Sequence, residues 1–430
     1  MITKVLIVVP PRRMSMKDRR NALPQFAARQ VTDIKTGGPR TLMRKVVLAV
    51  GSLAAVPFVL VARLIRPMVL IRFGGLPTMH LGHLALDMEL VRCRTDAGQY
   101  GRRVFDMFCL SQSIANQQLT RMWRRVVHVS QFARATERVN RWLPGGDANR
   151  IPFEPFVNDV QVLLPRTRPH LSFTPDEERE GYGALGRLGI SRDDPFVCLS
   201  ARDPAYYVGR PRYGDEQQRH RNSEIHTYLP AAEGLVRRGY TVVRMGAAVE
   251  QALQTDRPRI IDYATTARTD FLDVFLSARC RFFVSDTGGL VAVAMTFRRP
   301  VAVANFIRWE FAGSWNPSDL FIPKKLWMRD ECRLMTVREI FQSGAGRWCK
   351  DDLYTAHGIE VLDNTPEEIA ALVTEMDERL KGTWHATEED EALQRRFLEQ
   401  VKRFCTLYSN VQAYRRIGAE FLRQHQELLA

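Results

Sequence analysis

Short apolar segments that alternate with helix-like segments constrain this chain more than any other feature. "MVLIRF" at 68–73 and "RVFDMFCL" at 103–110 have the length and composition of buried strands, and "NQQLTRMWRR" at 116–125 reads as a helix. The same alternation restarts with "PFVCLSARD" at 195–203. Strands that alternate with helices are typical of βαβ units and a parallel sheet. The sequence therefore predicts an α/β protein with two Rossmann-like domains that face each other across a cleft.

The length of 430 residues, with 45% hydrophobic residues, also suits two globular domains. A stretch rich in Pro and Gly separates the two blocks of alternation and predicts the linker. The predicted parts are a basic arm with an apolar segment (1–67), a first domain (68–180), a second domain (195–365), and C-terminal helices that pack back across both domains (366–430).

The seven cysteines are scattered and contain no C-x-x-C pair. That pattern fits a reducing cytosol and gives no sign of a disulfide framework or a zinc knuckle. The expected location is the cytoplasm.

The net charge of +14 is concentrated at the N-terminus, where residues 1–66 hold thirteen Lys and Arg against two acids. This arm leads into an uncharged apolar run at 46–62 that Arg63 and Arg66 follow. Three interpretations stay open: a helix lying at an anionic membrane surface, a membrane-spanning anchor, and a buried core helix. The flanking charges favour peripheral association with the cytoplasmic face of the inner membrane.

Polar and glycine residues follow the predicted strands of the second half. Ligands of open α/β sheets bind beyond the carboxyl ends of the strands, so these residues are expected at one binding rim. The candidates are Arg202, Asp203, Arg244, Gly246, Asp262, Asp286, Thr287, Gly288, Gly289 and Asn305.

"VSDTGGLVAVA" at 284–294 is the sharpest of these strand ends. Glycines let a ligand approach backbone N–H groups, and the following helix start favours negative charge, so the turn suits a diphosphate. A plain tight turn is the alternative. The turn is neither G-x-G-x-x-G nor a P-loop, which disfavours NAD and P-loop chemistry, and no cofactor is predicted.

His220, Arg221 and Asn222 form a polar cluster ahead of a helix that contains Pro230 in its first turn. Arginine presents a planar fork that suits phosphate oxygens, so the cluster is a second candidate for the diphosphate. A solvated basic loop is the alternative. The sequence contains no D-x-D pair. We therefore expect protein donors, and no metal, to neutralise a leaving diphosphate.

In the first half, His80 and His83 flank Gly82 at a predicted strand-to-helix junction. A histidine at a helix start that faces a cleft suits a general base for a sugar hydroxyl. The catalytic candidates are His83 with Asp87 and Glu89 on the same helix, and Asn116 is a further residue expected near the cleft.

These residues resemble a family of bacterial glycosyltransferases found with surface-polysaccharide genes. The matching motifs stand at Gly82–Ala85 with Glu89, Asn116–Arg121, Arg202-Asp203 with Tyr206-Tyr207, Arg221–Tyr228, Gly239–Gly246, Ile260–Ala264, Asp273–Phe283 and Ser285–Gly288. The "SDTGG" turn is also similar, more distantly, to heptosyltransferase-like GT-B enzymes.

The resemblance implies a GT-B fold, a nucleotide-sugar donor in the C-terminal domain, and a glycan or lipid-linked acceptor in the N-terminal domain. Asp87 lies near the family's acidic position, which leaves open whether Asp87 or Glu89 is the functional carboxylate.

Two other functions compete with glycosyl transfer. A GT-B-type sugar-nucleotide epimerase would use the same donor domain, but an enzyme of soluble sugar nucleotides needs no membrane-directed arm. A nucleic-acid-binding protein is suggested by the pI of 9.7. The positive charge lies in a terminal arm and is not interleaved with aromatic residues, so nucleic acid is not an expected partner.

Overall fold

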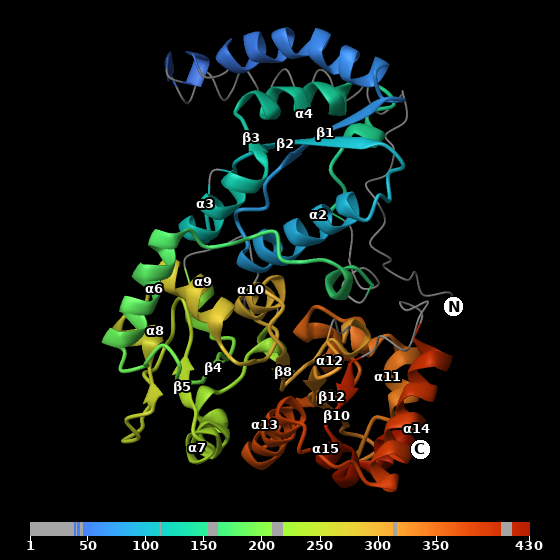
Figure 1. Ribbon diagram of the computed structural model, residues 1–430. Helices are drawn as coiled ribbons and strands as arrows, with labels where there is room; N and C mark the ends of the chain where they lie inside the picture. The colour runs from blue at the N-terminus through green and yellow to red at the C-terminus, as the bar shows by residue number, and fades with distance from the viewer. Residues whose placement is uncertain are drawn as a thin grey trace.

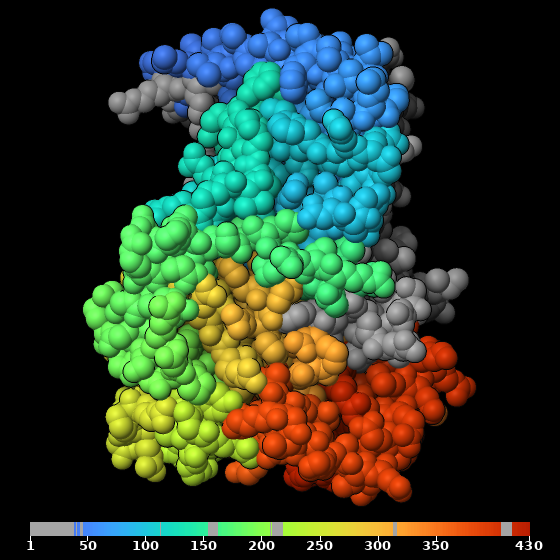
Figure 2. Space-filling model, in the orientation of Figure 1, coloured from blue at the N-terminus to red at the C-terminus, as the bar shows by residue number. Residues whose placement is uncertain are grey.

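The computed structural model describes residues 38–39, 41–43, 46–111, 113–153, 162–208, 218–312, 316–405 and 415–430. Two α/β domains lie one above the other, and the segment that enters α6 (Pro175–Arg187) leads from the first to the second (Figure 1). In the space-filling view this green segment lies across the middle of the molecule (Figure 2). Residues 1–37 of the predicted basic arm lie outside the described residues.

The first sheet has the parallel order β1-β2-β3, with strands β1 (Val69–Gly75), β2 (Arg103–Cys109) and β3 (His128–Val129). Helices α2 (Met88–Asp96) and α3 (Gln117–Val126) cover the face toward the second domain, and α4 (Phe132–Trp142) covers the other face (Figure 1). Successive side chains of β2 point to opposite faces of the sheet, so they pack against different helices. Phe108 packs with α2 and α3, whereas Met107 and Cys109 pack with α4.

The apolar run forms part of a helix, Thr41–Leu64, that lies beside α4 at the far end of the molecule from the second domain (Figure 1). We call residues 46–64 the outer helix. Ala55, Val59 and Ala62 are buried against the first sheet, while Leu53 and Leu64 are 75% and 80% exposed. One face of the outer helix therefore belongs to the core, and the other is apolar and open.

The second sheet has seven strands in the order β13-β9-β8-β7-β4-β5-β6, and every pair is parallel. Most of its residues are buried, as expected when helices cover both faces of a parallel sheet. The strands are β4 (Phe196–Leu199), β5 (Thr241–Arg244), β6 (Ile260–Ile261), β7 (Phe283–Ser285), β8 (Val301–Val303), β9 (Leu320–Phe321) and β13 (Arg416–Ile417).

Local sequence signals explain the helix starts of this domain. Thr174 and Glu177 form a capping box at α6, and the side chain of Thr269 caps α9. The helices are α7 (Leu229–Arg237), α8 (Tyr263–Thr266), α9 (Asp270–Arg279), α10 (Gly289–Thr296), α11 (Val337–Ser343), α12 (Asp351–Ala356), α13 (Pro366–Lys381), α14 (Glu388–Phe404) and α15 (Ala419–Gln424).

A small antiparallel sheet, absent from the sequence prediction, lies beside the second sheet. Its order is β11-β10-β12, with β10 (Lys325–Met328) pairing with both β11 (Arg333–Leu334) and β12 (Ile359–Leu362).

The prediction that the C-terminal helices cross both domains is wrong. Helix α13 packs on α7, β8 and β9, α14 packs on α11, and β13 extends the second sheet. These elements lie at the end of the molecule opposite the first sheet (Figure 1). The buried apolar residues of α13 and α14 belong to the core of the second domain, which explains the placement.

The two domains share a hydrophobic contact between helices α9 and α10 and the segment 83–88, which leads into α2. Ala85 and Met88 from the first domain are buried with Val274, Ala292 and Val293 from the second. At this contact a Cβ atom added to Gly289 would lie 3.2 Å from the backbone nitrogen of Gly82. Glycine at these positions allows the two backbones to approach at the edge of the cleft.

Candidate functional site

A cleft of about 490 Å³ lies between the two domains and is lined by both. The second domain contributes the carboxyl ends of β4, β5 and β7, as expected for an open parallel sheet. Nine predicted residues line it: His83, Asp87, Arg202, Asp203, Arg221, Gly246, Thr287, Gly288 and Gly289.

The turn between β7 and α10 is held by Asp286, which is buried below it. Its carboxylate accepts hydrogen bonds from the backbone N–H of Arg202 (2.6 Å), the hydroxyl of Ser223 (3.1 Å) and the backbone N–H of Gly288 (3.1 Å). Burial raises the pKa of Asp286. Asp286 therefore joins three loops and does not line the cleft, which corrects its prediction as a substrate-binding residue, whereas Thr287, Gly288 and Gly289 do line it.

The guanidinium of Arg221 fixes the next loop against this turn. It donates to the backbone oxygen of Thr287 (3.0 Å) and to the side chains of Thr287 (3.3 Å) and Gln218 (2.9 Å). Arg202 donates to the backbone oxygen of Gln218 (2.9 Å) and to the side chain of Asn222 (3.0 Å). Two arginines and the N-terminus of α10 thus line one side of the cleft, an arrangement that favours an anion.

His83 and Asp87 face this wall from the first domain. They begin and end a turn of π-helix, His83–Asp87, that leads into α2, and His83 Nδ1 lies 2.7 Å from Asp87 Oδ2. π-Turns inside helices are frequent at functional sites. The hydrogen bond to Asp87 raises the pKa of His83, whereas burial lowers the pKa of neighbouring His80. The carboxylate occupies Nδ1, which leaves Nε2 of His83 for a substrate.

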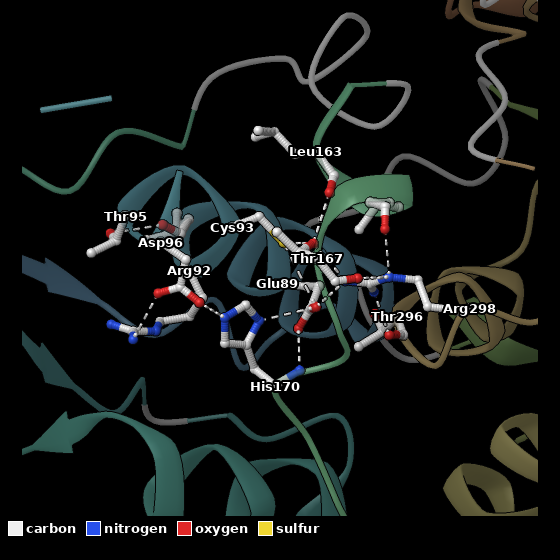
Figure 3. Close-up of polar contacts among 12 residues, drawn as sticks. Glu89, Arg92, Cys93, Thr95, Asp96, Leu163, Thr167, His170, Thr296 and Arg298 are labelled. Atoms are coloured by element: carbon white, nitrogen blue, oxygen red, sulfur yellow. Dashed lines mark hydrogen bonds and ion pairs between the residues drawn. The ribbon is translucent and has the colours of Figure 1, made fainter. Parts of the chain in front are cut away.

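Glu89 does not reach the cleft, which corrects its prediction as a catalytic residue. Its side chain is fully buried at the junction of the two domains and the linker (Figure 3). Arg298 donates to Glu89 (2.7 Å) and to the linker at Leu164 (3.0 Å), and His170 Nδ1 lies 3.1 Å from Glu89. A carboxylate this buried needs charged partners, and these partners give Glu89 a structural role.

Among the described residues, Glu89, Cys93 and His170 are the one group whose atoms lie close enough to hold a metal ion. The guanidinium of Arg298 already lies there, 2.7 Å from Glu89 and 3.8 Å from the sulfur of Cys93 (Figure 3). A guanidinium cation already pairs with two of the three residues, so this donor set does not fit a metal.

Three further candidates lie outside the cleft. Arg244 and Asp262 form a buried ion pair at 2.8 Å, and Asp262 also accepts from the backbone N–H of Leu253. Asn305 is buried and exchanges hydrogen bonds of 2.6 Å with Asn364. Their donors and acceptors are used within the fold, so the prediction that they bind substrate is corrected.

Asn116 joins the domains and does not line the cleft. Its side chain caps α3 by accepting from Leu119 N and donates to the backbone oxygen of Asp270, at the start of α9 (2.9 Å). This contact fixes α3 of the first domain against α9 of the second.

The three residues of the predicted cluster at 220–222 line two different pockets. Arg221 lines the cleft, whereas His220 and Asn222 line a separate pocket. His220 is fixed there by a short contact between its Nδ1 and Asp351.

Sequence reasoning missed two arginines that line the cleft, Arg268 and Arg308. Arg268 pairs with Asp270 and Asp273, both at 2.8 Å, while the guanidinium of Arg308 lies 4.0 Å from the ring centre of Phe311. The Nε atom of Arg308 is buried without a partner among the described residues. Arg308 lies in the loop that follows β8. The search for polar residues after predicted strands selected Asn305 in this same loop, so the sequence indicated the loop but not the residue that lines the cleft.

No protein-family model matches the chain, and no curated protein matches it. Among solved structures, the glycosyl transferase family 9 protein from Veillonella parvula DSM 2008 is 11% identical, with a TM-score of 0.31, over 54% of this chain and 80% of that one. The E. coli ADP-heptose lps heptosyltransferase II is 14% identical, with a TM-score of 0.32, over 54% and 84%. The iron-containing heptosyltransferase TibC is 16% identical, with a TM-score of 0.32, over 58% and 62%.

The fold is GT-B-like. Two parallel α/β domains face each other across a cleft that both of them line, as the sequence predicted.

Proposed function

We propose that this protein is a glycosyltransferase that moves a sugar from a nucleotide-sugar donor to a glycan or lipid-linked acceptor. One observation carries the proposal: Arg202, Arg221 and the start of α10 in one domain face a His–Asp pair in the other across a single cleft. Such a cleft can hold a donor diphosphate and an acceptor hydroxyl at the same time, which a simple binding protein does not need.

In the proposed reaction the diphosphate of the donor lies against Thr287, Gly288 and the start of α10. Nε2 of His83 takes the proton of the acceptor hydroxyl, and the acceptor oxygen forms a bond to the anomeric carbon. The bond between that carbon and the diphosphate oxygen breaks, and the electron pair leaves with the diphosphate. Arg221 and Arg202, with Arg308, stabilise the charge that develops there.

Binding of nucleotide sugars tests this proposal directly. Thermal-shift and calorimetric titrations with UDP-, GDP-, ADP-, dTDP- and CMP-sugars should find at least one that binds the wild-type protein. Steady product formation should then require an added glycan acceptor. Turnover of the sugar nucleotide to an isomer without an acceptor would identify an epimerase, and no binding by the whole panel would contradict the proposal.

We propose metal-independent transfer, because the sequence lacks D-x-D and the cleft wall carries several guanidinium groups. Activity should therefore persist in excess EDTA. Loss of activity in EDTA that added Mg²⁺ or Mn²⁺ restores would overturn this part of the proposal.

We further propose that the enzyme works at the cytoplasmic face of the inner membrane, in surface-polysaccharide biosynthesis. The helix Thr41–Leu64, which contains the outer helix, is long and apolar enough to cross a membrane by length and composition, yet one face of the outer helix packs on the first sheet. A helix held in this way suits an in-plane position, with its open apolar face among lipid headgroups. The basic N-terminal sequence would add attraction to anionic lipid.

A further inference from the structure

Arg308 differs from the other three arginines that line the cleft. Arg202, Arg221 and Arg268 donate hydrogen bonds to other residues of the second domain. The side chain of Arg308 makes no hydrogen bond or ion pair with the described residues, and its guanidinium lies 4.0 Å from the ring centre of Phe311. This cation–π contact holds the group without using its N–H donors. Since Nε is buried, the terminal nitrogens of Arg308 are the atoms that an anion in the cleft can reach.

The position of Arg308 depends on the turn that follows it. This 3₁₀ turn, Trp309–Phe311, packs on a second 3₁₀ turn, Ala345–Arg347. The packing is close at Gly346, where an added Cβ atom would lie 3.2 Å from the Cβ atom of Trp309 and 3.4 Å from Cγ of Glu310. Any shift of one turn against the other therefore moves the segment that carries Arg308.

Glu310 places a buried carboxylate between the two turns. Its side chain is 1% exposed, and Nε of Arg347 lies 3.0 Å from its Oε1 in an ion pair without hydrogen-bond geometry. Burial raises the pKa of Glu310 to about 7, although the charge of Arg347 opposes this shift. An apolar side chain usually stabilises a fold as well as a buried ion pair does, so stability alone gives no reason for a carboxylate here.

We propose that the ion pair between Glu310 and Arg347 positions Arg308 for the donor diphosphate. Glu310 does not line the cleft, so it acts through the turn and does not touch the substrate. Its attraction to Arg347 holds the two turns together, and Phe311 at the end of the first turn then supports the guanidinium of Arg308. This inference rests on the proposed function, in which Arg308 meets the charge of the diphosphate.

Calorimetric titration of the full chain tests the positions of these charges. The probe is whichever of UDP-, GDP-, ADP- or dTDP-glucose the wild-type protein binds most tightly. Arg308→Met should weaken binding about tenfold or more, the effect of losing one hydrogen bond to a charged group. Arg347→Met, at a half-exposed position, should also weaken binding, and Arg347→Lys should restore most of the affinity. Arg329→Met, which removes an exposed ion pair with Glu360, is the control and should bind normally.

A double-mutant cycle separates positioning of Arg308 from a general effect on the fold. Glu310→Gln should weaken binding in the wild-type background. The same substitution should cause no further loss in Arg308→Met, because the residue through which Glu310 acts is then absent. Losses that add in the double variant would overturn the proposal.

The pH dependence of affinity gives a second readout of Glu310. Protonation of this carboxylate removes its attraction to Arg347, so wild-type affinity should fall several-fold from about pH 8 to about pH 6, across the pKa of about 7. The diphosphate of a sugar nucleotide keeps its charge in this range. Arg308→Met should lack this change, and an equal change in that variant would assign the effect to another group and overturn the proposal.

The outcomes also separate this inference from the proposed function. Binding of a sugar nucleotide that Arg308→Met and Arg347→Met leave unchanged would overturn the inference and leave the transferase proposal intact. No binding of any of the four probes to the wild-type protein would overturn both.

Discussion

At the scale of single residues, the pair formed by His83 and Asp87 gives a pH prediction. The hydrogen bond to Asp87 raises the pKa of His83 above 6.5, and a general base must be neutral to act. The rate kcat/KM should therefore rise with pH through this raised pKa and then level off. His83→Gln should lower kcat/KM by about 10²–10⁴-fold and remove this acid limb.

Asp87→Asn provides the matched variant, because it keeps the size of the side chain and removes its charge. The midpoint of the acid limb should then move down toward 6.5, the ordinary value of histidine. A midpoint that stays where it is in Asp87→Asn would show that another group controls the profile.

Arg221 supports a second prediction at this scale, on nucleotide affinity. Its guanidinium lies against the Thr287 turn and lines the cleft, so it is placed to meet a diphosphate. Arg221→Ala should weaken binding of the nucleotide sugar by about 1.5–3 kcal/mol, the contribution of a hydrogen bond to a charged group. Calorimetry measures this. Arg237→Ala, at an exposed position on α7, is the control and should bind normally.

At the scale of elements, the outer helix has an apolar face that is exposed in the described structure. Val50 and Leu53 are 62% and 75% exposed on this face. The double substitution Val50→Glu with Leu53→Glu should lower sedimentation with anionic liposomes by about tenfold or more, because burial of each apolar side chain contributes about 1.5–3 kcal/mol. Folding should be unaffected.

Val208→Glu is the control for this experiment, since Val208 is 78% exposed in the second domain, away from the outer helix. High salt should release only part of the bound wild-type protein, because screening weakens attraction between charges but not apolar burial. Full-length protein that ignores anionic liposomes at low salt would show that the apolar face has another partner.

The position of the outer helix also bears on the acceptor. The first sheet and helices α2 and α3 lie between this helix and the cleft (Figure 1). A membrane on the open apolar face would thus be separated from the cleft by the thickness of the first domain. An acceptor that extends from the lipid surface as a glycan suits this separation better than a sugar attached directly to lipid.

At the scale of the whole molecule, the cluster around Glu89 joins both domains and the linker. Glu89→Gln keeps the shape of the side chain but leaves Arg298 without its charged partner and removes one of the two carboxylates beside His170. Loss of one member of a buried ion pair costs about 3–5 kcal/mol, so urea unfolding should show a decrease of this size. Glu360→Gln removes the exposed pair with Arg329 and should change stability by about 1 kcal/mol or less.

The same cluster predicts how stability depends on pH. Burial disfavours the charged form of His170, but its contacts with Cys93, Glu89 and Asp96 outweigh this and raise its pKa to about 10. A raised pKa stabilises the fold below the unfolded value of 6.5, and this contribution disappears as the pH rises toward 10. Wild-type protein should therefore lose stability between these values, and His170→Asn should lose less. Equal losses would contradict the proposed role of His170.

The sequence by itself determined the alternation of strands and helices, the GT-B-like pairing of two parallel sheets, and the loops that form the cleft. These features depend on patterns within a few residues: apolar runs, capping residues such as Thr174, and the glycines that follow Asp286. Strand direction then places all carboxyl ends at one edge, so the rim could be inferred without coordinates.

Only the tertiary structure decided which residue of each loop meets the cleft and which is used inside the fold. Arg298 reaches Glu89 across 209 positions of the chain, and the 218–223 loop turns Arg221 one way and His220 the other. The same holds for β13, which joins the second sheet from the C-terminus. The burial of a side chain and the hydrogen bonds and ion pairs that it makes depend on partners that are distant in the sequence. Local sequence patterns therefore do not predict them.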